Sequence, residues 1–242
     1  MSQIQSSNQG SIEKKQFGCD CERCDLRDLF FDHVDDTILA EICSSKEENN
    51  YEKGDLIIRE GEDLINFIYL RSGLVKLYRT DKEGKSQIIK IGKPLDFVSL
   101  LSVFSDTMHK YSVTALEHSV TCSIKLSRII ELAKENGEFA LNLMQKMSRV
   151  YDQIIIDFLE IRKKHLRGRT AHVLLFFADS VYKSNHFELP ISRKEIAEFI
   201  GMTPENVIRT LSEFRKDSLI SINGKQIAII EKKKLLMISE HG

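Results

Sequence analysis

The sequence predicts an α+β protein in which a domain of short β-strands is followed by a long helical stretch and then by a small module of two helices and a β-hairpin. Three patterns carry this prediction. Glycines separate short apolar runs over residues 51–126, helical periodicity takes over in residues 127–182, and two amphipathic helices precede a hairpin signal in residues 190–229. At 242 residues with 42% apolar content, the chain is long enough to form two domains.

The first part of the chain divides into a tail, a cysteine-containing segment and a strand-rich region. Residues 1–18 are polar in composition and are predicted to be a disordered tail. After residue 51, glycines at positions 54, 61, 73, 84 and 92 alternate with runs such as LIIRE, FIYL and LVKLY. Regular turn signals between short strands are typical of a β sandwich or roll. We expect residues 19–126 to form this domain together with the cysteines that precede the strands.

The helical stretch that follows predicts a dimerisation helix over residues 127–165. Apolar residues recur in it at steps of three and four, with a single aspartate in the stripe. The predicted dimer seam consists of Met147, Val150, Ile154, Asp157 and Ile161. A helix that is buried within its own chain would produce the same stripe.

Residues 166–242 are predicted to form a winged helix-turn-helix. The first helix buries Ile196, Ala197 and Ile200 on one face. Gly201 supplies the turn, and the pair Thr203 and Pro204 reads as an N-cap followed by proline at the first helical position. The second helix then has an apolar face of Val207, Leu211 and Phe214. Beyond it, LISINGKQIAII alternates apolar residues around an Asn-Gly pair, which is a strong hairpin signal.

The charge of this last module favours a polyanionic partner. From residue 161 onward the chain carries 15 Lys and Arg against 9 Asp and Glu, whereas the rest carries 20 against 27. Cationic contacts to phosphates supply most of the sequence-independent affinity for DNA. In a helix-turn-helix, residues on the outward side of the second helix near its N-terminus reach base edges in the major groove. The sequence therefore predicts double-stranded DNA as a partner, and a two-fold dimer would read two half-sites one DNA turn apart.

Together, these features resemble the CRP/FNR superfamily of bacterial transcription regulators from about residue 20 onward. IYLRSGLVKLY at Ile68–Tyr78 is similar to the family's roll signature, and GMTPENVIRTLSEF at Gly201–Phe214 is similar to its recognition helix. The resemblance implies a roll like that of cyclic-nucleotide-binding domains, a homodimer on a palindromic promoter site, and RNA polymerase as a further partner.

The resemblance also assigns roles on the recognition helix. Glu205 matches the family's glutamate that accepts from a cytosine amino group, and Arg209 matches its arginine that donates to guanine. Donor and acceptor chemistry supports both pairings independently. Ile208 departs from the small or hydroxyl residue usual in the family and can offer only apolar contact, for instance to a thymine methyl. Other predicted DNA-contact residues, several of them suited to phosphate, are Ser192, Arg193, Thr203, Asn206, Ser212, Arg215 and Lys216.

The residues in the roll do not favour a cyclic nucleotide as the effector. Members that bind one grip its phosphate with an arginine and its ribose with a glutamate, but Gly84–Leu116, where these should lie, contains neither residue type. Lys93 or Lys110 could still contact a phosphate, although lysine lacks the bidentate fork of arginine.

The cysteines suggest an effector other than a cyclic nucleotide. Cys19, Cys21 and Cys24 precede the roll, and Cys122 lies in a segment similar to the one that carries the distant cluster cysteine of FNR-type oxygen sensors, so a [4Fe-4S] cluster on these four is one hypothesis. The N-terminal spacing is tighter than in those sensors, and Phe30 stands where their next cysteine lies. Alternatives are cysteines left from a lost cluster, a zinc site, or a different small ligand or haem in the roll. Cys43 reads as a core residue.

Asp157 suggests how binding of a cluster could act on dimerisation. Two like charges facing each other across a dimer axis would weaken association, so the apo-protein could lie near a monomer–dimer balance that a cluster would shift. FNR-type sensors have an aspartate on this helix too, although a gapless alignment places it at Ile154. Alternatively, Asp157 simply faces solvent.

Other function classes find little support. The sequence has no glycine-rich phosphate loop and no nucleophile elbow, so we do not expect an enzyme. Its apolar runs, such as LLFFA at Leu174–Ala178, are far shorter than the roughly 20 residues that cross a bilayer, and its N-terminus is not a signal sequence. A cytoplasmic protein without a membrane partner is expected.

Overall fold

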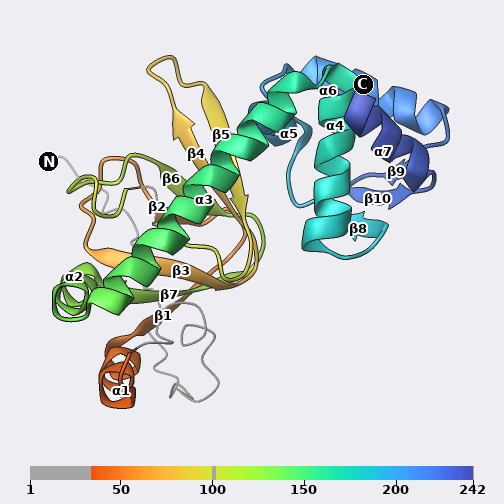
Figure 1. The fold of residues 1–242 in the computed structure, drawn as a ribbon. Helices are drawn as coiled ribbons and strands as arrows, with labels where there is room; N and C mark the ends of the chain where they lie inside the picture. Colours follow the sequence, from red (N-terminus) through yellow and green to blue (C-terminus); the bar gives the residue numbers. More distant parts are fainter. Residues whose placement is uncertain (1–33, 100–101, 242) are drawn as a thin grey trace, which may run out of the picture.

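A computed structural model describes residues 34–99 and 102–241 of the chain. In these residues a β-roll lies at one end, a long helix runs along the molecule, and a compact domain of helices and a small sheet lies at the other end (Figure 1). The predicted α+β class, with roll, long helix and C-terminal winged helix-turn-helix in this order, is confirmed.

The strands of the roll form two antiparallel sheets. One has the order β1-β7-β3, with β1 at Glu47–Tyr51, β7 at Ser119–Lys125 and β3 at Asn66–Ser72. The other has the order β2-β6-β4-β5, with β2 at Leu56–Ile58, β6 at Ser112–Ala115, β4 at Val75–Thr80 and β5 at Ser86–Gly92. Gly73 makes the tight turn from β3 to β4 possible: its φ is +88°, and a Cβ there would lie 2.4 Å from the carbonyl oxygen of His118.

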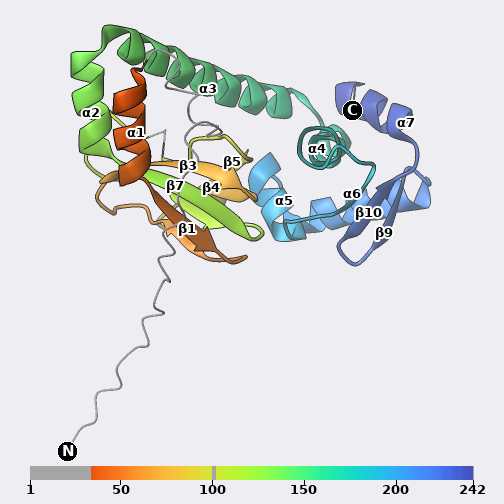
Figure 2. The same ribbon diagram turned by 90° about the horizontal axis from the view of Figure 1, so that it is seen from below.

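Three helices accompany the roll: α1 at Asp36–Ser45, α2 at Leu126–Glu135 and α3 at Gly137–Lys163. α1 and α2 lie side by side at the N-terminal end of α3 (Figure 2). The helical stretch predicted from residue 127 is thus divided in two. The division falls at Asn136, whose backbone is extended and whose side chain accepts a hydrogen bond from the amide of Phe139, so that it caps α3.

The C-terminal domain contains more elements than the sequence predicts. α4 (Leu166–Leu175) continues directly into a wider π-helical turn, η3 (Phe176–Val181). α5 (Arg193–Ile200) and α6 (Pro204–Lys216) form the helix-turn-helix, and β9 (Ile220–Asn223) and β10 (Gln226–Ile229) form the predicted hairpin around Gly224. A third strand, β8 (His186–Glu188), pairs with β10, and α7 (Lys232–His241) packs against α4.

The C-terminal domain is docked on the roll of the same chain. One apolar core runs from Leu74, Ile88 and Leu116 of the roll into the buried face of the helix-turn-helix. Polar contacts between the roll and the C-terminal domain lie beside this apolar core. Lys76 on β4 lies 2.6 Å from Glu195 on α5, and Lys53 donates to the carbonyl of Pro190. In Figure 2, α5 accordingly lies next to β5 and the roll. A structural change in the roll would therefore act on the helix-turn-helix through direct contacts.

Candidate nucleic-acid interface

The local sequence of α6 fixes where this helix begins and which face it buries. Thr203 caps it by accepting a hydrogen bond from the amide of Asn206, and Pro204 occupies its first position. Val207, Leu211 and Phe214 are buried, as the apolar periodicity predicts. Packing of this face against α5 and α4 leaves the opposite face of α6 in solvent.

The solvent-facing side of α6 carries the predicted base-reading residues. Glu205, Ile208, Arg209 and Ser212 are all exposed. Arg209 donates from Nη2 to Oδ1 of Asn206 at 2.9 Å, which holds the guanidinium along the helix surface beside Glu205. The Ser212 hydroxyl donates to the carbonyl of Ile208 one turn earlier. A cationic fork and a carboxylate thus lie together on one accessible surface.

Glu205 is held in its ionised form by the start of α6. Its own backbone amide and the hydroxyl of Thr203 lower the pKa of its carboxyl below the usual value. A carboxylate in the first turn of a helix is also favoured by the helix dipole. At neutral pH, Glu205 is therefore a hydrogen-bond acceptor, which is what a cytosine amino group requires.

α5 supports the reading helix through a complete capping box. The hydroxyl of Ser192 accepts from the amide of Glu195, and the Glu195 carboxylate accepts in return from the amide of Ser192. Gly201 ends α5 with φ +66° and allows the sharp turn into α6. Ser192 and Thr203 therefore act as caps. Each hydroxyl also donates to a carboxylate, that of Glu195 for Ser192 and that of Glu205 for Thr203, and the phosphate contacts predicted for both residues stay predictions.

Arg193 has a role that sequence reasoning missed. Its Nη2 donates to the carbonyl of Gly224 in the wing turn at 3.1 Å, and burial lowers the pKa of its guanidinium. This side chain thus ties the wing to the start of α5, and its predicted phosphate contact stays a prediction. Nothing in the spacing of the sequence signals this bond. Arg215 and Lys216, in the last turn of α6, are exposed and remain candidates for phosphate contact.

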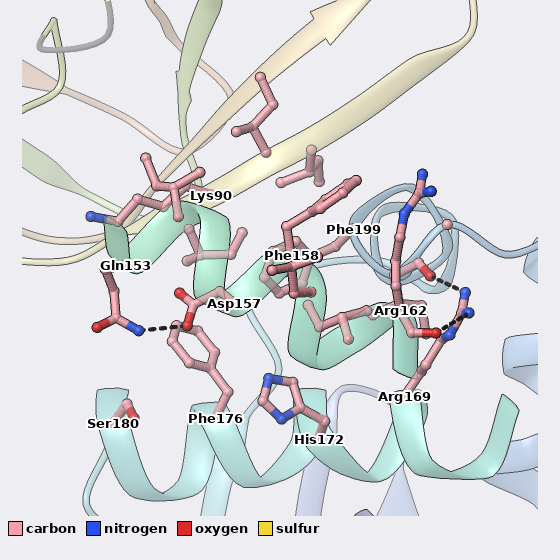
Figure 3. Close-up of a pocket in the computed structure, with 18 of the residues that line it drawn as sticks. Lys90, Gln153, Asp157, Phe158, Arg162, Arg169, His172, Phe176, Ser180 and Phe199 are labelled. Atoms are coloured by element: carbon pink, nitrogen blue, oxygen red, sulfur yellow. Dashed lines mark hydrogen bonds between the residues drawn. The ribbon is translucent and has the colours of Figure 1, made fainter. Parts of the chain in front are cut away.

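Arg169 is a residue that the sequence did not single out. Its guanidinium donates to three backbone carbonyls, those of Arg162 and Lys164 at the end of α3 and that of Ile200 at the end of α5. Figure 3 shows Arg162 and Arg169 side by side at this junction. The end of the long helix and the turn of the helix-turn-helix are thus joined by one side chain. Arg169 positions the reading helix relative to α3.

The predicted dimer seam lies largely on the side of α3 that faces its own chain. Met147 and Val150 pack against the roll core, and Ile161 is buried in the core shared with the C-terminal domain. Ile154 and Asp157 line a groove of about 1300 Å³ between α3, β5, α4 and α5. There Asp157 accepts a hydrogen bond from Gln153, and Figure 3 shows its carboxylate pointing toward α4.

Another stripe of α3 is exposed to solvent. It follows steps of three and four along the whole helix and includes large apolar side chains that are about half exposed. Its exposed members are Leu141, Met144, Ser148, Ile155 and Phe158, and Tyr151 between them is half-buried. Ile155 and Phe158 also contribute to the lining of the groove described above. Asp157 is two positions from Ile155 and so lies on nearly the opposite side of the helix.

The cysteines are only partly visible. Cys19, Cys21 and Cys24, three of the four predicted cluster ligands, lie outside the described residues. Cys43 is buried, as predicted for a core residue. Cys122 is completely buried on β7, and burial raises the pKa of its thiol to about 11. Its Sγ lies 3.8 Å from Oε1 of Glu48, which itself is paired with Lys46 and Arg71.

A cluster ligand must be a thiolate that the other ligands can reach. Cys122 is a neutral thiol inside the roll core, and the carboxylate beside it disfavours added negative charge. Because the three other predicted ligands lie outside the described residues, the cluster stays a prediction. Within the described ranges, moreover, no three His, Cys, Asp or Glu side chains are grouped so that they could hold a metal.

The burial of Cys122 predicts that its thiol reacts slowly with alkylating reagents. In the folded, reduced protein, alkylation of Cys122 by iodoacetamide should be slower than that of a free cysteine by about the ratio of folded to unfolded protein, because the thiol is reached only through opening of the roll. Mass spectrometry of peptides after timed labelling measures this rate, and labelling in denaturant is the control. Rapid labelling under native conditions would contradict the buried position.

Across residues 34–99 and 102–241, no helix has the length and apolar character needed to cross a membrane.

Two domain families match the chain in the order that the fold shows. Residues 48–136 match the cyclic nucleotide-binding domain, and residues 168–238 match the Crp-like helix-turn-helix domain. The first covers the roll and α2, and the second runs from α4 into α7. The two matches are independent of each other.

Curated relatives and solved structures agree with these matches. The chain is 29% identical over 191 residues to the transcriptional activator protein Anr of Pseudomonas protegens, covering 77% of this chain and 78% of Anr. It is 27% identical over 196 residues to the fumarate and nitrate reduction regulatory protein of Escherichia coli, covering 78% and 77%.

Among solved structures, FixK2 from Bradyrhizobium japonicum has a TM-score of 0.71 at 23% identity over 81% of this chain and 98% of FixK2. A Crp/Fnr-family regulator from Eubacterium rectale has a TM-score of 0.73 at 19% identity over 87% and 97%. These two likenesses show the fold. With the two domain matches, their order and the curated relatives, they establish that the chain belongs to the CRP/FNR superfamily of DNA-binding transcription regulators.

Proposed function

We propose that this chain regulates transcription as a homodimer that reads a palindromic promoter site, with one α6 in each half-site. The observation that carries the proposal is the solvent-exposed pair of Glu205 and Arg209 on a helix whose other face is buried. A guanidinium suits O6 and N7 of guanine, and a carboxylate suits N4 of cytosine. The two side chains together favour a C·G pair within each half-site.

The exposed stripe of α3 supports the dimer. Large apolar side chains at heptad spacing on one helix are typical of a coiled-coil seam, and two such stripes can pair about a two-fold axis. Two copies joined in this way would present two α6 helices, and half-sites one DNA turn apart would match them. RNA polymerase, implied by the family, would be the partner that converts binding into regulation.

Selection of binding sites from a pool of randomised DNA duplexes tests this function. We expect the full chain to enrich an inverted repeat with a C·G pair at the same place in each half. Binding should weaken steeply with salt, with a slope of about −0.9 for each phosphate contact. Enrichment of no sequence over the starting pool would contradict the proposal.

The contact between roll and helix-turn-helix supports regulation by the roll. Lys76, which pairs with Glu195, is part of the roll signature, and Glu195 also belongs to the capping box that starts α5. Both side chains are mostly shielded from water, at 17% and 22% exposed. Displacement of β4 by an effector would therefore act directly on the helix that supports α6.

Replacing Lys76 by methionine is expected to loosen α5 from the roll. Burial alone would raise the pKa of Glu195, but hydrogen bonds from Lys76 and from Ser192 outweigh it and leave the pKa below the usual value. Amide hydrogen exchange in α5 should therefore quicken in Lys76→Met at neutral pH. Arg79→Met is the control, because Arg79 pairs with Glu60 inside the roll.

The same pair predicts a pH dependence. A carboxyl whose pKa is lowered on folding stabilises the folded state above its unfolded pKa, about 4.5, and this stabilisation is lost as the pH falls through the folded pKa. The difference in melting temperature between wild type and Lys76→Met should be full at neutral pH and shrink below about pH 4.5. An equal difference at every pH would show that the pair does not stabilise the docking.

For the effector itself, we propose no cyclic nucleotide, because Gly84–Leu116 lacks both the arginine and the glutamate that would grip one. The names of relatives such as the fumarate and nitrate reduction regulatory protein favour an input linked to respiration. A cluster on Cys19, Cys21, Cys24 and Cys122 is one candidate input, and a ligand or haem in the roll is the alternative. Visible spectra of anaerobically purified wild type and Cys122→Ser distinguish these two hypotheses. Cluster absorption that is present in the wild type and lost in the variant supports the cluster. A haem band that is kept in both proteins supports haem in the roll.

A further inference from the structure

The outward face of α6 carries an isoleucine where a DNA-reading surface is usually polar. Ile208 is 51% exposed, precedes Arg209 directly and lies one turn after Glu205. A single exposed apolar residue is common on protein surfaces and by itself indicates nothing. The surroundings of Ile208 give it a more specific meaning.

Ile208 borders a small depression between α6 and the wing, with a volume of about 130 Å³. Its apolar side is formed by Ile208, Leu211 and the half-buried Ile222 of β9. The depression is fixed in shape, because Leu211 belongs to the core and Arg193 bonds the wing turn to α5. Ser212, Arg193 and Arg215 form its polar side.

This combination suits one chemical group in the major groove. Of the atoms that base pairs present there, only the C5-methyl group of thymine is apolar. That methyl lies at the edge of the groove close to the phosphates of its own strand. A depression with an apolar side next to an exposed arginine, Arg215, can receive the methyl while the cation faces the adjacent phosphate.

Resting on the proposed function, we propose that Ile208 and the depression beside it make the protein specific for a thymine near the C·G pair of each half-site. Ile208 is thereby a specificity-determining residue. It rejects cytosine, which has only a hydrogen at C5, and purines, which present the polar acceptor N7 at that edge instead of a methyl group. The readout is apolar and independent of the hydrogen bonds made by Arg209.

Replacement of thymine by deoxyuridine in the selected palindrome tests the proposal, since it removes only the methyl group and keeps the base pair. One thymine in each half-site is expected to be sensitive, with binding weakened about fourfold per half-site and about fifteenfold when both are changed. Fluorescence anisotropy with the full chain at constant salt measures the affinities.

Two variants complete the experiment. In Ile208→Ser the ratio of affinities for thymine and deoxyuridine should fall to about one, while binding remains sensitive to the C·G pair. Ile230→Ser is the control, because Ile230 is equally exposed but lies after β10, outside α6 and the wing strand β9, and the ratio should persist in it.

If no thymine responds, or if the response survives in Ile208→Ser, the inference about Ile208 is wrong while the proposed function stands. If the wild type showed no preference for any DNA sequence, the proposed function itself would be wrong.

Discussion

Arg209→Ala is expected to abolish the preference of the protein for its palindrome over random DNA. Each bidentate arginine–guanine contact discriminates against a wrong base by about 1–3 kcal/mol, and a dimer makes two of them. The affinity for the palindrome should therefore fall between about 30-fold and about 20,000-fold, whereas the affinity for random DNA falls only slightly. Competition binding with both duplexes at one salt concentration measures the two effects.

Lys216→Ala is the matched control for this prediction. Lys216 is also exposed and cationic but lies at the far end of α6, where phosphate contact is expected. Its removal should weaken binding to every sequence alike and reduce the salt slope by about one for each phosphate that the variant no longer binds. If Arg209→Ala behaves in the same way as Lys216→Ala, Arg209 holds phosphate and does not read a base.

Ile155→Lys is expected to convert the protein into a monomer. Ile155 is 56% exposed toward the C-terminal end of the outward stripe of α3, and its replacement would place two ammonium groups near the two-fold axis. A monomer engages one half-site, so affinity for the palindrome should fall by on the order of 100-fold or more. Sedimentation velocity and binding titrations measure the two effects.

Gln153→Lys introduces the same charge on nearly the opposite side of the same helix. Gln153 is exposed and hydrogen-bonds Asp157, so a lysine there meets a carboxylate. This variant should remain a dimer. The same geometry applies to Asp157→Ala: the sequence suggested that it would strengthen dimerisation, whereas its place opposite Ile155 predicts no change. A monomeric Gln153→Lys or a dimeric Ile155→Lys would place the interface on the predicted seam.

The sequence predicts the fold well where local signals agree with packing. Thr203, Pro204 and Gly201 each fix a helix end through their own backbone preferences, and the structure places those ends as predicted. The break at Asn136 was missed because an asparagine inside an amphipathic stretch does not interrupt its periodicity, although it caps the following helix. β8 was missed because three residues are too few to show alternation.

The sequence predicts the identity of the reading residues better than their surroundings. Glu205 and Arg209 could be found because their chemistry and their place in the helix-turn-helix agree. The bond from Arg193 to Gly224 and the three bonds of Arg169 join segments far apart in the sequence, and no local pattern encodes them. Periodicity alone also could not identify the dimer-forming side of α3, because one periodic stripe packs on its own chain while another faces solvent.

Methylation interference at guanine N7 tests the central claim, that α6 reads bases in the major groove, most directly. A methyl group at N7 blocks the acceptor that Arg209 is proposed to contact. We predict that methylation of one guanine in each half-site prevents binding of the wild type, and that Arg209→Ala, assayed at higher protein concentration, no longer distinguishes methylated from unmodified guanine. Wild-type binding that is indifferent to methylation of every guanine in the site would contradict the account.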